Sequence, residues 1–105
     1  MSSTTVKKKA TRAALQFFDG APLQALSGHV DRYKGIRIAD DKIESSASVD
    51  EFRGLLTRSI QVYKENGFRG VWLKLKKDKA HLAGVAVQDA GFSFHHAKED
   101  YIMMT

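Results

Sequence analysis

The chain has 105 residues, no cysteine and a formal net charge of +5, which fits a single small domain. The lack of cysteine excludes disulfides and zinc sites of the Cys type, and no apolar run approaches the length of about 18 residues that a membrane span needs. The excess positive charge lies at the start, in Lys7, Lys8, Lys9 and Arg12. The rest of the chain holds the other 13 of the 17 basic residues against 12 acidic ones. Because binding to phosphate backbones usually needs a basic face, this count does not favour nucleic acid as a partner.

The first segment is expected to be a flexible basic tail over residues 1–12, since it offers almost nothing to bury. Its basic, acid-free composition also fits a mitochondrial presequence, but its single arginine favours a cytoplasmic location. Residues 13–28 contain short apolar pieces broken by Asp19-Gly20 and Pro22. They are compatible with either a helical turn or a lead-in strand.

The best-marked element is a helix over residues 49–66. Ser48 and Glu51 form an S-x-x-E capping box at its start, and Asn66-Gly67 is a stop signal at its end. Apolar residues recur between them at helical spacing. A strand is predicted before this helix, at "YKGIRIA", where Ile36 and Ile38 alternate with polar residues.

The C-terminal part predicts a strand, a helix and two more strands. In "GVWLKLKK", Leu73 and Leu75 point to one face and Trp72 to the other. Asp78 is expected to cap a second helix that Gly91 ends, with Leu82, Val85 and Ala86 facing inward. The segments "FSFHH", which Phe92 and Phe94 are expected to anchor, and "YIMMT" form a hairpin through "AKED".

These elements predict an α+β fold with the order β-α-β-α-β-β and a single mixed sheet covered by helices on at least one face. The strands of Trp72 and Phe92 are joined through a helix, so they are expected to run parallel. The last two strands are expected to be antiparallel. A large aromatic such as Trp72 on the second face of the sheet is either covered or kept for a partner, and we expect a partner.

Two adjacent histidines, His95 and His96, are the first candidates for chemistry. Successive side chains of a regular strand point to opposite faces, so the two rings are not expected to bind one metal ion. One ring is expected to pack on the core side and the other to face solvent or a partner. The sequence shows no catalytic triad, P-loop or G-x-G-x-x-G motif, and we assign no catalytic, cofactor-binding or metal-ligating residue.

A group of lysines follows Trp72 in the sequence, at positions 74, 76, 77 and 79. These side chains either keep a strand edge and a helix start soluble or contact an anion. The interleaved aromatic residues of an RNA-binding sheet are not apparent beside them.

The segments "GVWLKL" and "AGFSFHHAKEDYIMMT" resemble the N-terminal, pre-nudix domain of a branch of the Nudix hydrolases. That branch includes the protein encoded antisense to basic fibroblast growth factor in vertebrates and the plant ADP-ribose and NADH diphosphatases. Lys98 departs from the pattern, because the family usually has Glu there. The residues that carry the resemblance and form a candidate interface are Trp72, Lys74, Gly91, Phe92, Phe94, His95, His96 and Tyr101.

The resemblance implies a fold like half of a GCN5-related acetyltransferase, with a tail and lead-in over residues 1–28 and the pre-nudix domain over 29–105. It also implies a catalytic Nudix domain that binds Mg²⁺ or Mn²⁺, but the family's G-x5-E-x7-R-E-U-x-E-E-x-G-U box does not occur before Thr105. We therefore expect an accessory domain without a cofactor or catalysis of its own. Its expected roles are docking on the Nudix domain in the same or another chain, homodimerisation, and shaping the access of a nucleotide diphosphate substrate.

Two alternatives stay open at this point. The first is a degenerate acetyltransferase-like module that binds coenzyme A or a nucleotide, although the R/Q-x-x-G-x-G/A loop that would hold a pyrophosphate is missing. The second is a nucleic-acid-binding domain that uses the basic arm.

Overall fold

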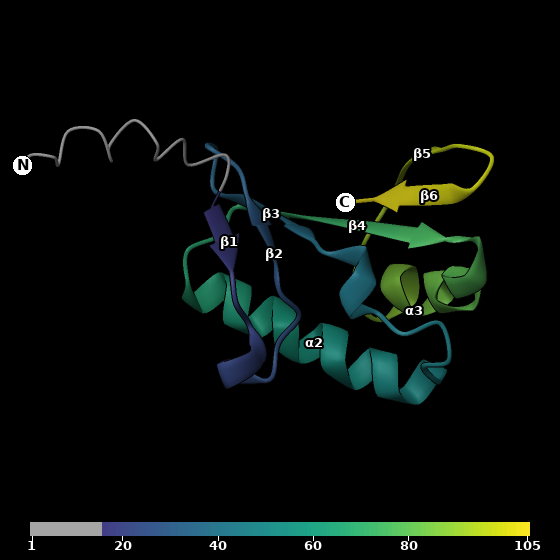
Figure 1. Cartoon of the computed structure of the whole chain (residues 1–105), viewed down its shortest axis with the longest axis horizontal. Coiled ribbons are helices and arrows are strands. Elements are labelled where there is room, and N and C mark those ends of the chain that lie inside the picture. The colour runs from purple at the N-terminus through teal and green to yellow at the C-terminus, as the bar shows by residue number, and fades with distance from the viewer. Residues whose placement is uncertain (1–15) are drawn as a thin grey trace, which may run out of the picture.

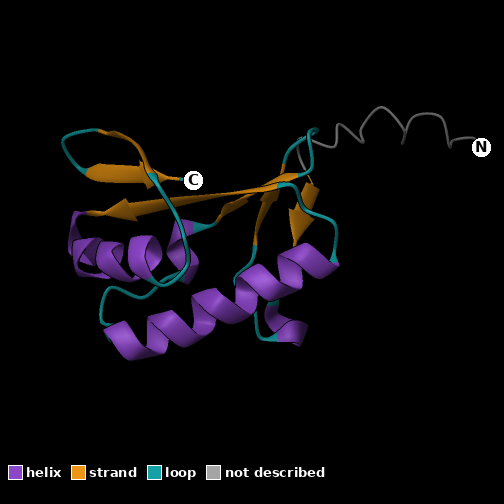
Figure 2. Ribbon diagram, turned by 180° about the vertical axis from the view of Figure 1, so that it is seen from behind, coloured by secondary structure: helices purple, strands orange, loops and turns teal. Residues whose placement is uncertain are grey.

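The computed structural model describes residues 16–105, so the expected tail over residues 1–12 lies outside the described range. The described part forms one six-stranded mixed sheet in the order β1-β2-β3-β4-β6-β5. Helices α2 and α3 both lie on the same side of β4 (Figures 1 and 2). The predicted single mixed sheet with helices is confirmed. The elements are β1 (Gln16–Phe18), β2 (Gly28–Val30), β3 (Gly35–Ile38), α2 (Val49–Glu65), β4 (Gly70–Lys76), α3 (Ala83–Gln88), β5 (Phe94–Ala97) and β6 (Tyr101–Met104).

Strand β4 lies between two halves of the sheet and pairs with a strand of each. On one side, β1, β2 and β3 form an antiparallel meander, and β3 pairs with β4 in parallel. On the other side, β6 pairs antiparallel with both β4 and β5. The predicted antiparallel hairpin is therefore confirmed, and β4 and β5 run in the same direction with β6 between them.

The N-terminal lead-in contributes more to the sheet than the sequence predicted. It contains both β1 and a 3₁₀ turn over Ala21–Leu23, followed by β2. The chain order is thus β-β-β-α-β-α-β-β, two strands longer than predicted, and the sheet begins upstream of the range 29–105.

Helix α2 has the predicted ends. Glu51 N–H donates to Ser48 Oγ at 3.0 Å, and Ser48 N–H donates to Glu51 Oε1 at 3.2 Å. This reciprocal pair satisfies two donors that a helix start leaves without partners. Asn66 ends the helix, and Gly67 has a φ of +78°, a left-handed conformation that glycine adopts without steric cost.

The start of the second helix differs from the prediction. A 3₁₀ helix over Lys77–Leu82 follows β4 directly, and α3 begins only at Ala83, without a side-chain cap. Asp78 therefore does not cap a helix, because the 3₁₀ helix has already begun at Lys77, one residue before Asp78. The inward-facing residues of this segment are as predicted, since Leu82, Val85 and Ala86 are buried.

The hydrophobic core lies between the sheet and the two helices, where Ile36, Leu56 and Leu73 are fully buried. Two polar side chains of α2 reach into it. Ser59 Oγ accepts a hydrogen bond from Leu26 N–H at 2.8 Å, and Tyr63 Oη donates to Leu26 O at 2.6 Å. These contacts tie the lead-in to the helix. In the described part of the chain, no helix is both long enough and apolar enough to cross a bilayer.

Candidate interface on the open face of the sheet

The alternation of β4 separates two faces of the sheet. Leu73 and Leu75 are buried toward the helices, and Trp72 and Lys74 point to the face that no helix covers in Figures 1 and 2, as predicted. We call this second face the outer face. Residues that pair across neighbouring strands form two rows on the outer face. One row runs through four strands, and the other runs through three. The first row is Phe17, His29, Arg37 and Trp72, and the second is Lys74, Met103 and His96.

The two histidines lie on the same face, so the prediction that they point to opposite faces is wrong. Phe94 pairs with Met104 and His96 with Met103, and this register shift is a β-bulge that holds His95 as the extra residue. A bulge interrupts the strict alternation of a strand. The two Nδ1 atoms are 2.8 Å apart, a hydrogen bond in which one ring donates and the other accepts.

Aromatic rings form a connected chain beside the bulge. The Trp72 and His95 ring centroids are 4.9 Å apart, and those of His96 and Tyr101 are 5.9 Å apart. Lys74 Nζ lies 4.4 Å from the Tyr101 ring centroid, a cation–π distance. The sequence did not reveal this interleaving of rings and cations, because it depends on which strands become neighbours.

The two phenylalanines of the motif differ in burial. Phe92 is buried, but Phe94 is 61% exposed, so only Phe92 anchors the segment as predicted. Phe94 belongs to β5, an edge strand, and lies with Leu75, Ala83 and Ile102 around an open groove of about 480 Å³. Its side chain lies on a strand that, within residues 16–105, pairs on one side only, with β6.

Gly91 ends the helical segment in a left-handed conformation, with a φ of +78°. Among the described residues, apart from its two chain neighbours, no atom lies within 4 Å of the position that a Cβ would occupy there. The requirement for glycine is therefore conformational, not steric crowding by neighbours.

The four lysines after Trp72 do not form one cluster. Lys79 is buried, and its Nζ donates to Asp40 O; Lys76 Nζ lies 3.5 Å from Asp40 Oδ2. Lys74 alone contacts the aromatic chain. The basic character of the outer face thus comes from Lys74 together with Arg37, which belongs to a different strand.

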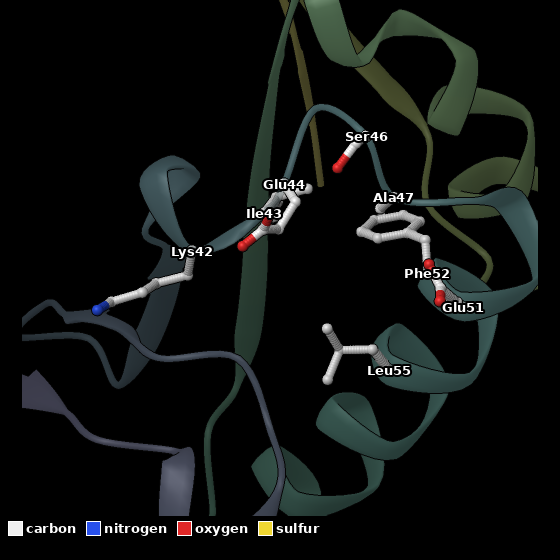
Figure 3. Close-up of a pocket in the computed structure, with 8 residues that line it drawn as sticks. All are labelled: Lys42, Ile43, Glu44, Ser46, Ala47, Glu51, Phe52 and Leu55. Atoms are coloured by element: carbon white, nitrogen blue, oxygen red, sulfur yellow. The ribbon is translucent and has the colours of Figure 1, made fainter.

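A second concave region lies between the turn after β3 and the first half of α2 (Figure 3). It has a volume of about 270 Å³, and Ile43, Phe52 and Leu55 provide its apolar wall. Of its polar residues, Glu51 is already engaged in the capping box. The other polar residues that line it are Lys42, Glu44 and Ser46.

Among residues 16–105, no group of three or more histidine, aspartate or glutamate residues is placed to hold a metal ion together. His81 Nε2 lies 2.9 Å from Ala47 O.

Sequence reasoning missed Phe17, His29 and Arg37 as part of the candidate interface. Strands of three or four residues place one or two side chains on the outer face, too few to give a readable alternation. The Phe17 and His29 rings contact each other with centroids 5.1 Å apart.

Comparison with known proteins identifies the family. The Nudix hydrolase domain matches residues 26–105. Nudix hydrolase 5 of Arabidopsis thaliana is 31% identical over 83 residues, which cover 79% of this chain and 27% of that protein. Nudix hydrolase 8 of the same plant is 32% identical over 80 residues, or 76% of this chain and 21% of that protein.

A mammalian protein is similar over the same extent. Nucleoside diphosphate-linked moiety X motif 6 of Mus musculus is 33% identical over 81 residues, which cover 75% of this chain and 25% of that protein. The chain thus spans about a quarter of the length of the curated relatives it matches. The chain belongs to the Nudix hydrolase family.

Proposed function

We propose that this chain is an accessory domain of a Nudix hydrolase, of the pre-nudix type. That type belongs to the branch of the family that includes the protein encoded antisense to basic fibroblast growth factor and the plant ADP-ribose and NADH diphosphatases. The observation that carries the proposal is the extent of the match. Nearly the whole described sheet lies in the matched region, and that region makes up about a quarter of the length of each relative. The larger part of each relative therefore lies outside the match.

In this proposal, hydrolysis of a nucleotide diphosphate takes place on a separate Nudix domain that binds Mg²⁺ or Mn²⁺. The described residues have no group of ligands for such an ion. The accessory domain acts without a cofactor, through docking on the Nudix domain, through homodimerisation, or through control of substrate access.

The groove beside β5 is the surface we assign to docking. Phe94 is a large exposed aromatic in an apolar groove, and buried aromatic anchors dominate the binding energy of protein interfaces. The free edge of β5 also leaves backbone groups available to a partner strand.

The test compares diphosphatase activity on ADP-ribose with Mg²⁺ or Mn²⁺ for this chain alone, for a separately produced Nudix-box domain from the same gene, and for their mixture. We expect no activity from the chain alone, and a stable complex or altered activity in the mixture. Robust activity of the 105-residue chain alone would overturn the proposal.

A matched pair of variants locates the contact. Phe94→Ala is expected to weaken the complex by at least about tenfold, the loss of one anchor residue. Tyr33→Ala removes another exposed aromatic, 69% exposed in the turn between β2 and β3, and is expected to leave the complex unchanged. Equal effects of both variants would exclude the groove as the docking surface.

A further inference from the structure

The strands of the described sheet contain no acidic residue. Their basic residues are Arg37, Lys74 and Lys76, of which Lys76 is paired with Asp40. The acidic residues of the described part lie in helices, turns and loops instead. The nearly neutral charge count after residue 12 thus coexists with a local difference, because the strand side chains of the outer face include the cations Arg37 and Lys74 and no carboxylate.

Aromatic rings cross this face from one edge of the sheet to the other. Phe17 and His29 are in contact at the β1 edge, and Trp72 contacts His95 at the bulge. Arg37 stands between these pairs, since it is the register partner of both His29 and Trp72. Five spacings of about 4.8 Å separate β1 from β5, so the face is roughly 24 Å wide.

Rings interleaved with cations on an open sheet suit a ligand that is both flat and anionic. Unpaired bases stack on aromatic side chains, and Lys or Arg neutralise the phosphates between them. A second copy of the chain fits less well, because face-to-face apposition would bring Arg37 and Lys74 against like charges.

We propose that the outer face binds single-stranded nucleic acid. Bases stack on Trp72, His95 and Phe17, and phosphates contact Arg37 and Lys74. This binding goes beyond the proposed accessory role, because it needs neither a Nudix domain nor catalysis. It also differs from binding by the basic arm alone, in which the sheet would be a passive support.

The experiment uses a fluorescently labelled ten-nucleotide oligouridine, in RNA and DNA forms, and measures its anisotropy with the full chain and with a chain that starts at residue 13. We expect the shortened chain to retain binding. Its plot of log affinity against log salt concentration should have a slope of about −1.4, as two phosphate contacts on a single strand require. Complete loss of binding on removal of residues 1–12 would overturn the proposal.

Substitutions on the shortened chain separate stacking from general electrostatics. Trp72→Ala is expected to weaken binding about 5- to 100-fold, the range for loss of one stacked base. Phe94→Ala is the matched control, since this exposed aromatic of β5 pairs with the buried Met104 and so lies on the helix side. It is expected to leave the affinity unchanged.

A charge reversal covers the case in which Trp72→Ala unfolds the chain. Arg37 is exposed, so Arg37→Glu should preserve the fold and weaken binding by at least about tenfold, with a shallower salt dependence. Lys64→Glu on α2 is the control and should have little effect. If Arg37→Glu and Trp72→Ala both fold and bind as the parent chain does, the outer face is not a nucleic-acid site, whatever the mixture with a Nudix domain shows.

Discussion

Leu26 is held by two side chains of α2. Its N–H donates to Ser59 Oγ and its C=O accepts from Tyr63 Oη, so both backbone polar groups of a buried residue are satisfied by α2. Ser59→Ala would leave the Leu26 N–H without a partner. We expect the free energy of unfolding to fall by about 1–3 kcal/mol, measured by urea denaturation.

The control for this prediction is Ser46→Ala, which changes an exposed serine and should shift stability by less than about 0.5 kcal/mol. Equal stability of Ser59→Ala and the parent chain would mean that water or a shifted backbone replaces the hydrogen bond.

Tyr63 gives the stability a dependence on alkaline pH. Burial raises the pKa of Tyr63 above its ordinary value of 10.0, and the hydrogen bond with Ser59 acts in the opposite direction. Above about pH 10 the unfolded chain loses this proton while the folded chain keeps it, so the free energy of unfolding falls as pH rises. The contribution is complete below about pH 10 and is lost as the pH rises through the raised folded pKa.

Tyr63→Phe should therefore be less stable at pH 7, by about 1–3 kcal/mol for the Leu26 carbonyl left without its donor. Above pH 10 it should lose stability less steeply than the parent chain, by up to about 1.4 kcal/mol per pH unit. Urea denaturation at a series of pH values checks both effects. Tyr33→Phe, at an exposed site, should follow the parent chain, and parallel curves for Tyr63→Phe and the parent would contradict the prediction.

At the residue scale, the sequence predicted side-chain orientations that follow from alternation along a strand. It missed orientations and contacts that depend on which strands and helices become neighbours in the fold. Trp72 lies on the predicted face because β4 is a long regular strand. His95 and His96 do not point to opposite faces as predicted, because the bulge in β5 depends on pairing with β6 and cannot be recognised in the sequence of a four-residue strand. Ser59 gave no signal either, since its partner is the backbone of Leu26, 33 residues away.

At the element scale, the capping box of α2 is a local device whose contribution can be measured alone. Ser48→Ala removes the acceptor for Glu51 N–H and is expected to lower the free energy of unfolding by about 1 kcal/mol. Ser48→Asp retains a capping oxygen and should restore most of the loss. Thermal unfolding followed by circular dichroism checks both, and equal losses in the two variants would show that the cap itself is not responsible.

Elements with strong local signals were predicted, and short ones were not. Helix α2 and strands β3, β4, β5 and β6 carry an apolar period or stop signals. Strands β1 and β2 have three residues each, so only pairing within the sheet defines them. The helical segment after β4 was predicted, but its start was placed at Asp78 because the sequence does not distinguish a 3₁₀ turn from the first turn of an α-helix.

At the scale of the whole described part, residues 16–105, one layer of helices covers one face of the sheet and leaves the other face open. The apolar side chains of the strands point toward the helices, and the aromatic rings and cations that alternate with them point to the outer face. The family match begins at residue 26, but β1 lies before it, and Phe18 packs against Tyr63 and Phe68. The folding unit is therefore expected to extend upstream of the matched range.

Truncation tests the extent of this unit. A chain of residues 13–105 keeps β1 and Leu26 and should unfold at the same temperature as the full chain. A chain of residues 29–105 loses β1 and Leu26, whose exposed fraction is only 3%. Burial of one leucine alone contributes about 1.5–3 kcal/mol, and the hydrogen bonds of Ser59 and Tyr63 are lost with it. We expect the shorter chain to melt at least about 10 °C lower or to stay unfolded, as circular dichroism and amide proton spectra would show. Equal melting of the two chains would mean that β1 and the lead-in are accessory to a smaller core, and the outer face would then begin at β3.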